Sequence, residues 1–409
     1  MKKILIITWN YPYYPGEQFL ETEIEFWENN EGVDIIILPS NTRGEPREIP
    51  QNIKLIKIFN QRNDFFFIIF QFFFSKILYI EIKYLIQEKK INIHNLINLC
   101  YSVLKTAFFR KKLENWIRKY GVIDIVYTYW NSEQTYAACI LKKKGLIKSI
   151  ITRTHGYDIY EERRQNNYMP LKRQFLPQMD KIYALSEQAK IYLLYRYKIP
   201  ENKVNIQRLG IHVGNEISGV TKVDEFHLVS VSSITSVKRI ERIIDSLDLF
   251  LAKNTNIKCF WTHIGSGILE KKIKEYSFTK LKYYKNLEVS FLGEISNEKV
   301  RQFYISNKVD MFINVSDSEG TPVSIMEAMS MGIPAMGPCI GGIPELITAT
   351  SGYLLPEKPT IQEIAEGLER MLVLSKNKDV RINAKRMVEA RFSAKKNYKT
   401  FVHEITSIN

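Results

Sequence analysis

The sequence contains few cysteines, and their spacing excludes the two kinds of site that cysteines most often build. Four occur among the 409 residues, and no two of them form a Cys-x-x-Cys pair. The sequence therefore predicts neither a zinc site nor a disulfide framework, and a reducing cytoplasm is the expected compartment. The four cysteines are Cys100, Cys139, Cys259 and Cys339.

Motifs that bind metal ions are also missing. The chain has no Asp-x-Asp motif and no group of histidines and carboxylates at the spacing of metal ligands. We therefore expect no metal ion and no cofactor. No internal repeat is evident either.

Apolar runs in the sequence are too short to cross a membrane. The most hydrophobic stretch, residues 65–75, has 11 uncharged residues, against the roughly 20 that a membrane-spanning helix needs. The N-terminal run MKKILIIT ends at Trp9, which is too soon for a signal peptide. A first β-strand is the better interpretation of that run.

The chain is long and positively charged. Its 409 residues are too many for one ordinary hydrophobic core and enough for two domains of about 200 residues each. The net charge of +14 is uneven, because residues 1–215 hold 32 Lys and Arg against 21 Asp and Glu, whereas the remaining residues hold 26 against 23. Positive clusters at residues 110–112 and 142–144 could attract nucleic acid, anionic lipid or a diphosphate-linked acceptor, although each cluster alone also fits a solvated helix face.

Phenylalanine is concentrated between residues 59 and 86. Two Phe-Phe-Phe runs begin at Phe65 and Phe72, and Lys76 and Lys83 follow them. Aromatic residues beside lysines are typical of a helix that lies in the membrane interface. A buried helix of the N-terminal domain is the alternative, and the sequence alone does not separate the two for the segment from Phe65 to Ile86.

Short apolar runs alternate with helical patterns along the chain. This order predicts an α/β fold with parallel sheets, right-handed crossovers and functional loops at the carboxyl ends of the strands. Residues 212–225 lack sustained periodicity, so we interpret them as a linker and hinge between two domains, residues 1–215 and 216–394. The expected strands are residues 3–8, 33–38, 123–128, 149–153 and 181–184 in the first domain and 226–232, 257–263, 287–292, 309–315, 333–337 and 352–355 in the second.

The most informative segment is VDMFINVSDSEGTPVSIMEAMSMGIPAMGPCIGGIPELI, residues 309–347. A buried strand is followed by turn residues, then by Thr321 as expected N-cap and Pro322 as expected first helical residue. The amides of Val323 and Ser324 would lack intrahelical acceptors, and with Gly320 in the preceding turn they would form an anion cradle at the positive end of the helix dipole. A diphosphate fits such a cradle.

Two glutamates bracket this turn. Glu319 precedes the helix, whereas Glu327 lies six residues past the expected cap, roughly 9 Å along the helix axis. Carboxylates repel phosphate, so near a diphosphate we expect them to accept hydroxyl groups, those of a hexose at Glu319 and those of a ribose at Glu327. A second glycine turn, residues 341–345, follows.

These residues resemble the donor-site signature of glycosyltransferase family 4, retaining enzymes of the GT-B architecture. The resemblance implies two Rossmann-like domains facing across a cleft, and it places Lys238, in the stretch FHLVSVSSITSVKRIERIIDSL, at the diphosphate-binding lysine. One departure is that Ser233 stands where many members carry an arginine. Neutralisation of the diphosphate would then depend on Lys238, with Arg239 as the expected assistant.

Further positions match the family more weakly. His155 resembles the cleft histidine near the transferred sugar, although a lone histidine is more often structural. Gly16 resembles the N-terminal glycine loop, and Gly265 the glycine turn after the second strand of the donor domain. The resemblance also implies base contacts from Gly293 and Glu294, acceptor contacts from Asp158 and Arg163, and a C-terminal helix, residues 395–409, returning to the N-terminal domain.

The resemblance implies a retaining hexosyltransferase. The hexose would move from a nucleotide diphosphate sugar, by family habit a UDP-sugar, to a polysaccharide or lipid-linked glycan that binds the N-terminal domain. We expect a cytoplasmic enzyme, peripheral at the inner face of the cell membrane if the phenylalanine-rich segment contacts anionic lipid, and no nucleic acid partner. The alternatives are a nucleotide-sugar epimerase of related fold and a non-catalytic nucleotide-binding member of an assembly, which the serine at 233 favours.

Overall fold

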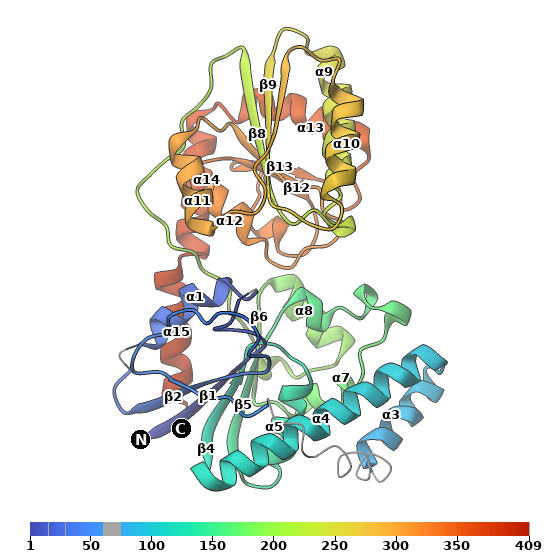
Figure 1. Cartoon of the computed structure of the whole chain (residues 1–409), viewed down its shortest axis with the longest axis vertical. Helices are drawn as coiled ribbons and strands as arrows, with labels where there is room; N and C mark the ends of the chain where they lie inside the picture. Colours follow the sequence, from blue (N-terminus) through green and yellow to red (C-terminus); the bar gives the residue numbers. More distant parts are fainter. Residues whose placement is uncertain (15, 29, 60–74, 409) are drawn as a thin grey trace. The chain divides into compact units, whose positions relative to one another are not determined.

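The structure, a computed structural model, describes residues 1–14, 16–28, 30–59 and 75–408. The chain divides into two compact units (Figure 1). The N-terminal unit comprises Met1–Arg208 together with Tyr398–Asn409, and the C-terminal unit comprises Leu209–Asn397. Each unit has its own parallel sheet and its own hydrophobic core.

A seven-stranded parallel sheet forms the centre of the N-terminal unit. Its strand order is β3-β2-β1-β4-β5-β6-β7, so the order reverses between β1 and β4. Residues Ile4–Ile7 of β1 are buried at consecutive positions, as expected for a strand covered on both faces. The strands are β1 (Lys2–Thr8), β2 (Val33–Pro39), β3 (Lys54–Leu55), β4 (Ile123–Thr128), β5 (Ile147–Thr154), β6 (Lys181–Ala184) and β7 (Val204–Ile206).

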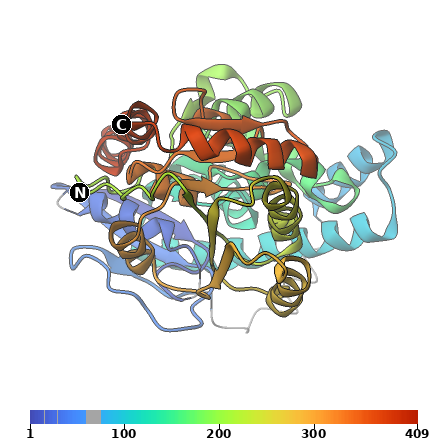
Figure 2. The same ribbon diagram turned by 90° about the horizontal axis from the view of Figure 1, so that it is seen from above.

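Helices cover both faces of this sheet. Ile4 and Ile6 pack in one cluster with Phe401 of the last helix, whereas Leu5 and Ile7 pack in another, which the helices before β4 and after β4 and β6 complete. Figures 1 and 2 both show α3 and α4, in cyan, side by side at one edge of the unit. The helices are α1 (Phe19–Ile24), α3 (Lys76–Gln87), α4 (Ile93–Tyr120), α5 (Glu133–Lys142), α6 (Gly156–Ile159), α7 (Lys172–Phe175), α8 (Glu187–Arg196) and the second part of α15 (Ala394–Ser407).

The C-terminal unit has a six-stranded parallel sheet of order β10-β9-β8-β11-β12-β13. The order again reverses once, here between β8 and β11. The strands are β8 (Glu225–Val231), β9 (Lys258–Ile264), β10 (Leu287–Phe291), β11 (Met311–Ile313), β12 (Ala335–Pro338) and β13 (Gly352–Leu355). Helices lie on both sides of this sheet in Figure 1. They are α9 (Ile240–Lys253), α10 (Glu270–Leu281), α11 (Asn297–Ser306), α12 (Val323–Ser330), α13 (Ile361–Leu374) and α14 (Lys378–Arg391).

The α/β fold expected from the alternating pattern is confirmed. Each of the eleven expected strands overlaps an observed strand of a parallel sheet. Two edge strands, β3 and β7, were not expected. They contain two and three residues, too few for a periodic pattern.

The structure corrects the prediction of a linker at residues 212–225, because this segment is part of the C-terminal unit. Gly219 pairs with Lys308 as an isolated bridge, and Ser218 donates its backbone N–H to Met331 O at 2.9 Å. The guanidinium of Arg381 donates to Ser218 O at 2.8 Å. The segment lacks periodicity because isolated contacts, and not a ladder, hold it in place.

The segment from Phe65 to Ile86 is described only in part. Residues 60–74 lie outside the described residues, and Lys76–Gln87 form α3. One face of α3 is buried and the other is exposed, so neither the buried helix nor the interfacial helix of the sequence analysis is contradicted here. Among the helices that the structure describes, none combines the length and the apolar character needed to cross a membrane.

The reversals in strand order locate the candidate sites. In open α/β sheets, ligands bind beyond the carboxyl ends of the strands where the order reverses, because the loops there diverge and leave a crevice. In the C-terminal unit this point lies between the loops after β8 and β11. In the N-terminal unit it lies between the loops after β1 and β4.

Candidate active site

Lys238 and Glu319 meet at the switch point of the C-terminal unit. Lys238 ends a short 3₁₀ helix after β8, and Glu319 lies in the loop after β11. Lys238 Nζ donates to Glu319 Oε1 at 2.7 Å, and Asn314 Nδ2 donates to the same oxygen at 3.0 Å. The two residues that the sequence assigns to catalysis in this unit are therefore in direct contact, although they lie 81 positions apart in the chain.

Asn314 was missed in the sequence analysis. It follows β11 directly, is buried, and also accepts the backbone N–H of Ser316 at 2.9 Å through Oδ1. One amide side chain thus fixes both the start of the loop and the carboxylate of Glu319. A polar residue at the carboxyl end of a buried strand was the signal that could have identified it.

Helix α12 begins one residue later than expected. Pro322 has φ −77° and ψ 105°, an extended conformation, so it occupies the N-cap position and α12 begins at Val323. Thr321 is therefore not the N-cap, and its buried Oγ1 has no hydrogen-bond partner among the described residues. The first amide that bonds back into the helix start is that of Ile325, to Pro322 O at 3.2 Å, so the amides of Val323 and Ser324 precede the helical ladder as predicted.

The second glycine turn packs directly on this loop. Gly342 N donates to Gly320 O at 2.6 Å, and Gly341 adopts a left-handed φ of +54°. A Cβ atom on Gly341 would lie 2.1 Å from Glu319 O, so only glycine permits this approach. The two glycines therefore hold the backbone of Glu319 in position.

We expect Gly341→Ala to lower the unfolding free energy of the C-terminal unit by about 2 kcal/mol or more, because it adds a backbone clash to the cost of a left-handed alanine. Urea unfolding measures this. Gly145→Ala is the matched control, since Gly145 has φ +73° and no atom within 4 Å of its added Cβ. Equal effects of the two substitutions would contradict a close contact between the loops.

Glu327 lies on α12 and is partly buried. Burial raises the pKa of its carboxyl group from 4.5 to about 7. Tyr304 is buried close enough to Glu327 to feel its charge, and its hydroxyl has no hydrogen-bond partner among the described residues. Hydrogen bonds from hydroxyl donors stabilise the charged form of such a carboxyl group.

The raised pKa predicts a specific pH dependence of stability. Below pH 4.5 the group is protonated in both states, and between pH 4.5 and about 7 the unfolded chain ionises more readily than the folded one, so stability falls as the pH rises. Between pH 5 and pH 8 we expect the ionisation of Glu327 to lower the unfolding free energy of the parent chain by on the order of 2 kcal/mol. Glu327→Gln should abolish this decrease. Urea unfolding of variant and parent at both pH values tests this, and parallel pH profiles would refute it.

The glycines after β9 and β10 connect the loops at this edge of the sheet. Gly265 has φ +131° and donates its N–H to Gly293 O at 2.8 Å, and its added Cβ would lie 2.0 Å from Ser232 O. The loops after β8, β9 and β10 are thus held together by backbone contacts. Glu294 is exposed, and its expected contact with a nucleotide base stays a prediction.

Arg239 does not present a free cation. Its Nε lies 2.9 Å from Glu241 Oε1 and 3.6 Å from Asp317 Oδ2, and Arg242 Nη1 lies 2.7 Å from Asp317 Oδ1. The guanidinium is therefore partly neutralised within its own unit. Its assistance to Lys238 stays a prediction, and Ser233 is exposed in the same loop.

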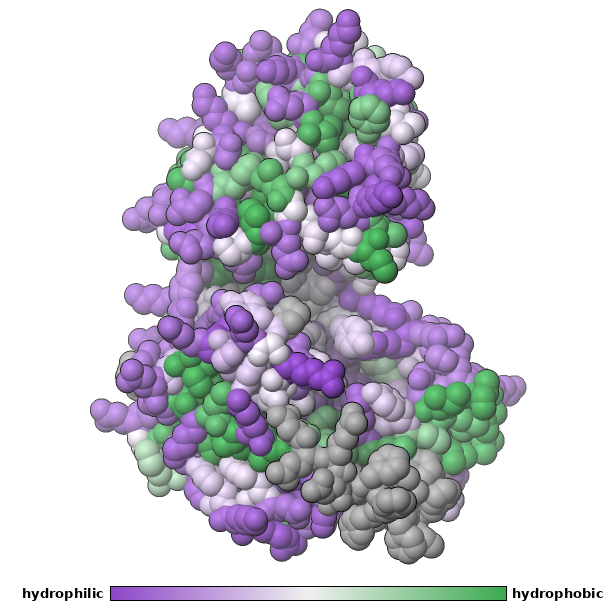
Figure 3. All heavy atoms as spheres, viewed as in Figure 1, coloured by the Kyte–Doolittle hydropathy of each residue, from purple (hydrophilic) through white to green (hydrophobic). Residues whose placement is uncertain are grey.

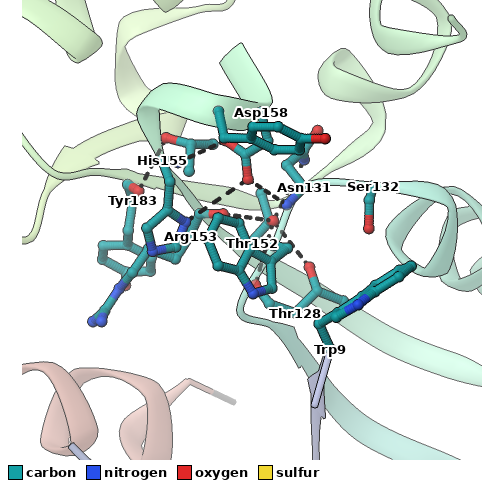
Figure 4. Close-up of polar contacts among 12 residues, drawn as sticks. Trp9, Thr128, Asn131, Ser132, Thr152, Arg153, His155, Asp158 and Tyr183 are labelled. Carbon is teal, nitrogen blue, oxygen red and sulfur yellow. Dashed lines mark hydrogen bonds and ion pairs between the residues drawn. The ribbon is translucent and has the colours of Figure 1, made fainter. Parts of the chain in front are cut away.

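His155 lies at the carboxyl ends of the strands of the N-terminal sheet, directly after β5 (Figure 4). Its ring centroid is 4.2 Å from that of Trp130, 4.7 Å from that of Tyr129 and 6.3 Å from that of Phe19. Among the described residues neither ring nitrogen has a hydrogen-bond partner, and Nδ1 lies 3.8 Å from Asp158 Oδ2. An imidazole held by aromatic rings with its nitrogens unused suits contact with a ligand.

Asp158 is engaged within its own unit, and the acceptor role expected for it stays a prediction. Its carboxylate is 5% exposed and accepts two backbone N–H groups, that of His155 at 2.6 Å and that of Asn131 at 2.9 Å. Figure 4 shows Asp158 between these two residues. It therefore joins the loops after β4 and β5, a role that its place in the sequence did not indicate.

A buried lysine completes this network and was also missed. Lys172 Nζ donates to Asn131 O at 2.6 Å and to Asn131 Oδ1 at 2.5 Å. Burial lowers the pKa of Lys172 from 10.5 to about 8, and the charge of Asp158 partly opposes this shift. Lys172 thus braces the loop that contacts Asp158 and, through it, His155.

The glycine loop after β1 is organised by Glu17. Its buried carboxylate accepts the backbone N–H groups of Trp9, Asn10 and Tyr11 at 3.0, 2.5 and 2.5 Å, and the indole N–H of Trp130 at 2.5 Å. Gly16, with φ +105°, makes the turn that brings Glu17 back under this loop. Sequence reasoning identified the turn formed by Gly16 and Glu17 but gave the glutamate no role.

The last expected acceptor residue, Arg163, is exposed. Its guanidinium carbon lies 4.3 Å from the centroid of the Tyr160 ring. Its acceptor role stays a prediction. Among the described residues no three His, Cys, Asp or Glu side chains gather closely enough to hold a metal ion.

Known proteins match both the sequence and the fold. Residues 216–387 match the family model of glycosyl transferases group 1. The putative colanic acid biosynthesis glycosyltransferase WcaL of Escherichia coli (strain K12) is 27% identical over 229 residues, 54% of this chain and 55% of WcaL. The amylovoran biosynthesis glycosyltransferase AmsK of Erwinia amylovora is 27% identical over 245 residues, 54% of this chain and 56% of AmsK. The chain spans about half the length of these curated relatives.

Solved structures resemble the whole chain. The lipopolysaccharide outer core galactosyltransferase WaaB, in its apo form, superposes with a TM-score of 0.72 and 18% identity over 99% of both chains. Anabaena HepE in complex with UDP and glucose superposes with a TM-score of 0.67 and 16% identity over 100% of both chains. The GT-B fold expected from the sequence is confirmed, and the match of segment 216–387 to the glycosyl transferases of group 1 agrees with the family resemblance seen in the sequence.

Proposed function

We propose that the chain is a retaining glycosyltransferase that moves a hexose from a nucleotide diphosphate sugar, in the first instance a UDP-sugar, to a polysaccharide or lipid-linked glycan acceptor. The observation that carries this proposal is the contact between Lys238 and Glu319 beside the free amides at the start of α12. One cation, a helix N-terminus and an oriented carboxylate at a switch point fit the diphosphate and the sugar of one donor.

Lys238 and the amides of Val323 and Ser324 stabilise the charge that develops on the departing diphosphate. A preorganised donor of this kind is commonly worth about 3–4 kcal/mol in the transition state. In a retaining transfer the leaving phosphate oxygen takes the proton of the acceptor hydroxyl on the same face of the sugar. The chain's own cation and amides supply the positive charge, so we propose that transfer needs no divalent metal ion, and an unchanged rate in a chelator is the expected result.

Glu319 and Glu327 hold the hydroxyl-bearing rings of the donor. Glu319 accepts from both Lys238 and Asn314 through Oε1, and in this proposal the carboxylate that they orient accepts a hexose hydroxyl. Glu327, with a pKa near 7, accepts ribose hydroxyls. His155 contacts the transferred sugar, since its ring nitrogens have no hydrogen-bond partner in the described part of the chain.

The names of relatives and of neighbouring structures support the substrate classes. WcaL and AmsK are named for the biosynthesis of colanic acid and amylovoran, which supports a polysaccharide product. HepE is described in complex with UDP and glucose, which supports a UDP-hexose donor. We propose the cytoplasm as the location, since the chain would there meet nucleotide sugars.

A thermal-shift panel of nucleotide sugars tests donor binding without an acceptor. Stabilisation grows with the ratio of ligand concentration to dissociation constant, about 2.7 kcal/mol at a ratio of 100. We expect a UDP-hexose to raise the melting temperature of the parent chain and to have little effect on Glu319→Ala. No stabilisation by any nucleotide sugar would refute the donor site.

A second candidate is a nucleotide-binding protein without transfer activity. The pairing of Arg239 with Glu241 and Asp317, together with the serine at 233, favours it, because less positive charge then faces a leaving diphosphate. Product analysis with radiolabelled donor separates the two. Donor binding without release of nucleoside diphosphate, in the presence of membrane extracts that supply acceptors, would favour the second candidate.

A further inference from the structure

Helix α3 has an outer face on which large apolar side chains are exposed. Its inner face, which includes Leu78 and Leu85, is buried in the N-terminal unit. On the outer face Tyr79, Ile80 and Ile86 are 62%, 45% and 57% exposed. Large apolar side chains gathered on one helix face, and not scattered singly, mark an interaction site.

The beginning of α4 continues this exposed apolar surface. Ile93, Ile97 and Tyr101 are 75%, 59% and 58% exposed, and their spacing of four residues aligns them along one side of the helix. Helices α3 and α4 pack against each other, and Figure 3 shows apolar side chains gathered over this end of the unit. We define the α3–α4 surface as Tyr79, Ile80, Ile86, Ile93, Ile97 and Tyr101.

The segment that carries this surface is strongly basic. Residues 76–120 contain ten Lys and Arg against three Asp and Glu, a net charge of +7. Of the three acids, Glu81 is buried, Glu114 is paired with Arg118 and Lys144, and Glu88 is exposed just after α3. On the outer face of α3, Lys76 and Lys83 are exposed and form no ion pair with a described residue.

The surface is firmly attached to its unit. The carboxylate of Glu81 accepts the N–H of Leu171 at 3.0 Å and the hydroxyl of Tyr168 at 3.2 Å. Arg173 Nε donates to Tyr84 Oη at 2.9 Å. Helix α3 is therefore a fixed element whose outer face is presented to a partner.

We propose that the α3–α4 surface docks on an anionic lipid bilayer. The isoleucines and tyrosines would enter the boundary between headgroups and acyl chains, and Lys76 and Lys83 would meet the headgroups. Apolar residues with interspersed lysines on one helix face match this interface, because apolar burial and electrostatic attraction add.

A second copy of the chain is a poorer fit to the same surface. A two-fold symmetric interface brings the same patch of both copies together, so Lys76 and Lys83 would face an excess of positive charge, against which Glu88 is the one exposed acid of residues 76–120. A bilayer with anionic lipid supplies negative charge over an extended plane. The charge of the segment thus selects lipid over self-association.

Docking here has a consequence for the acceptor, which rests on the proposed function. Helix α3 contacts Tyr168, Leu171 and Arg173, and Lys172 in the same segment braces Asn131. The element that meets the lipid is therefore connected to the loops that hold His155. The acceptor class this favours is a glycan linked to a membrane lipid.

The test is co-sedimentation of the full chain with phosphatidylcholine vesicles, with and without phosphatidylglycerol. We expect binding to the anionic vesicles at least about tenfold tighter than to neutral ones, weakening as salt is added. Lys76→Gln/Lys83→Gln should weaken binding about 25-fold, about fivefold for each lysine. Tyr79→Ser/Ile86→Ser should weaken it about tenfold or more.

Phe278→Ser/Tyr283→Ser is the matched control, because these residues are 71% and 76% exposed on a lysine-rich surface of the C-terminal unit. It should bind vesicles as the parent does. No binding to anionic vesicles at low salt, equal losses in the control, or a dimer in light scattering that Tyr79→Ser/Ile86→Ser dissolves would each overturn the proposal. Nucleotide-sugar thermal shifts on the same variants are independent of lipid, so a failed donor site and a failed membrane surface give different results.

Discussion

Replacing Lys238 with methionine is expected to lower the rate of glycosyl transfer by about 10²–10³-fold. The ammonium group lies 2.7 Å from Glu319 Oε1 and is the cation in direct contact with the carboxylate assigned to the sugar. Its loss removes positive charge from the leaving diphosphate and leaves the 8% exposed side chain of Glu319 without that ion pair. Initial rates with radiolabelled donor measure the effect.

The control for Lys238→Met is Lys285→Met, an exposed lysine of the same unit. It should transfer at the parental rate. Circular dichroism confirms that both variants fold, and Lys238→Arg should recover part of the activity because it restores the charge with a different shape. A Lys238→Met variant that binds donor and turns over at the parental rate would remove this lysine from the mechanism.

Arg153→Met is expected to destabilise the N-terminal unit by about 3–5 kcal/mol. Arg153 and Glu23 are both fully buried and form an ion pair, and Tyr127 donates its hydroxyl to the same carboxylate at 3.0 Å. The guanidinium carbon also lies 4.5 Å from the ring centroid of Phe401. Removal of the arginine leaves a buried carboxylate without its countercharge, which costs more than the pair itself contributes.

Calorimetry tests this prediction through a double variant. Arg153→Met should lower the melting temperature of the N-terminal unit by about 10 °C, and adding Glu23→Gln should recover much of the loss because the unpaired charge is gone. Lys190→Met, which breaks the exposed pair between Lys190 and Glu201, is the control and should have a far smaller effect. Equal melting temperatures for the single and double variants would show that the unpaired charge of Glu23 is not what destabilises the Arg153→Met variant.

The parts of the fold that could be predicted are those that long local patterns determine. The buried strands have runs of apolar residues, and β1 and β2 were expected to within one residue at each end. Strands β3 and β7 are set by the edges of a sheet that other segments build, so their two or three residues carry too little pattern. The prediction of a linker at residues 212–225 failed for a related reason, because a segment held by isolated contacts with α12 and α14 shows no periodicity.

The candidate site divides in the same way. Glu319 and the amides after Pro322 follow from a local motif, whereas Lys238 was expected from the family resemblance, and the structure brings the two charged side chains together. The aromatic surroundings of His155 could not be predicted, since Phe19 and Trp130 come from distant segments of the chain. The structural role of Asp158 could not be predicted, because the sequence shows that a carboxylate follows a strand and does not show that two backbone amides donate to it.

The last helix imposes an order on biosynthesis. Phe401, Val402 and Ile405 of α15 complete the core that Ile4, Trp27 and Tyr183 begin, yet roughly 190 residues separate Arg208 from Tyr398. At about 5–20 residues per second, the nascent N-terminal unit waits on the order of 10–40 s with one side of its sheet uncovered. The half translated first is thus the half finished last.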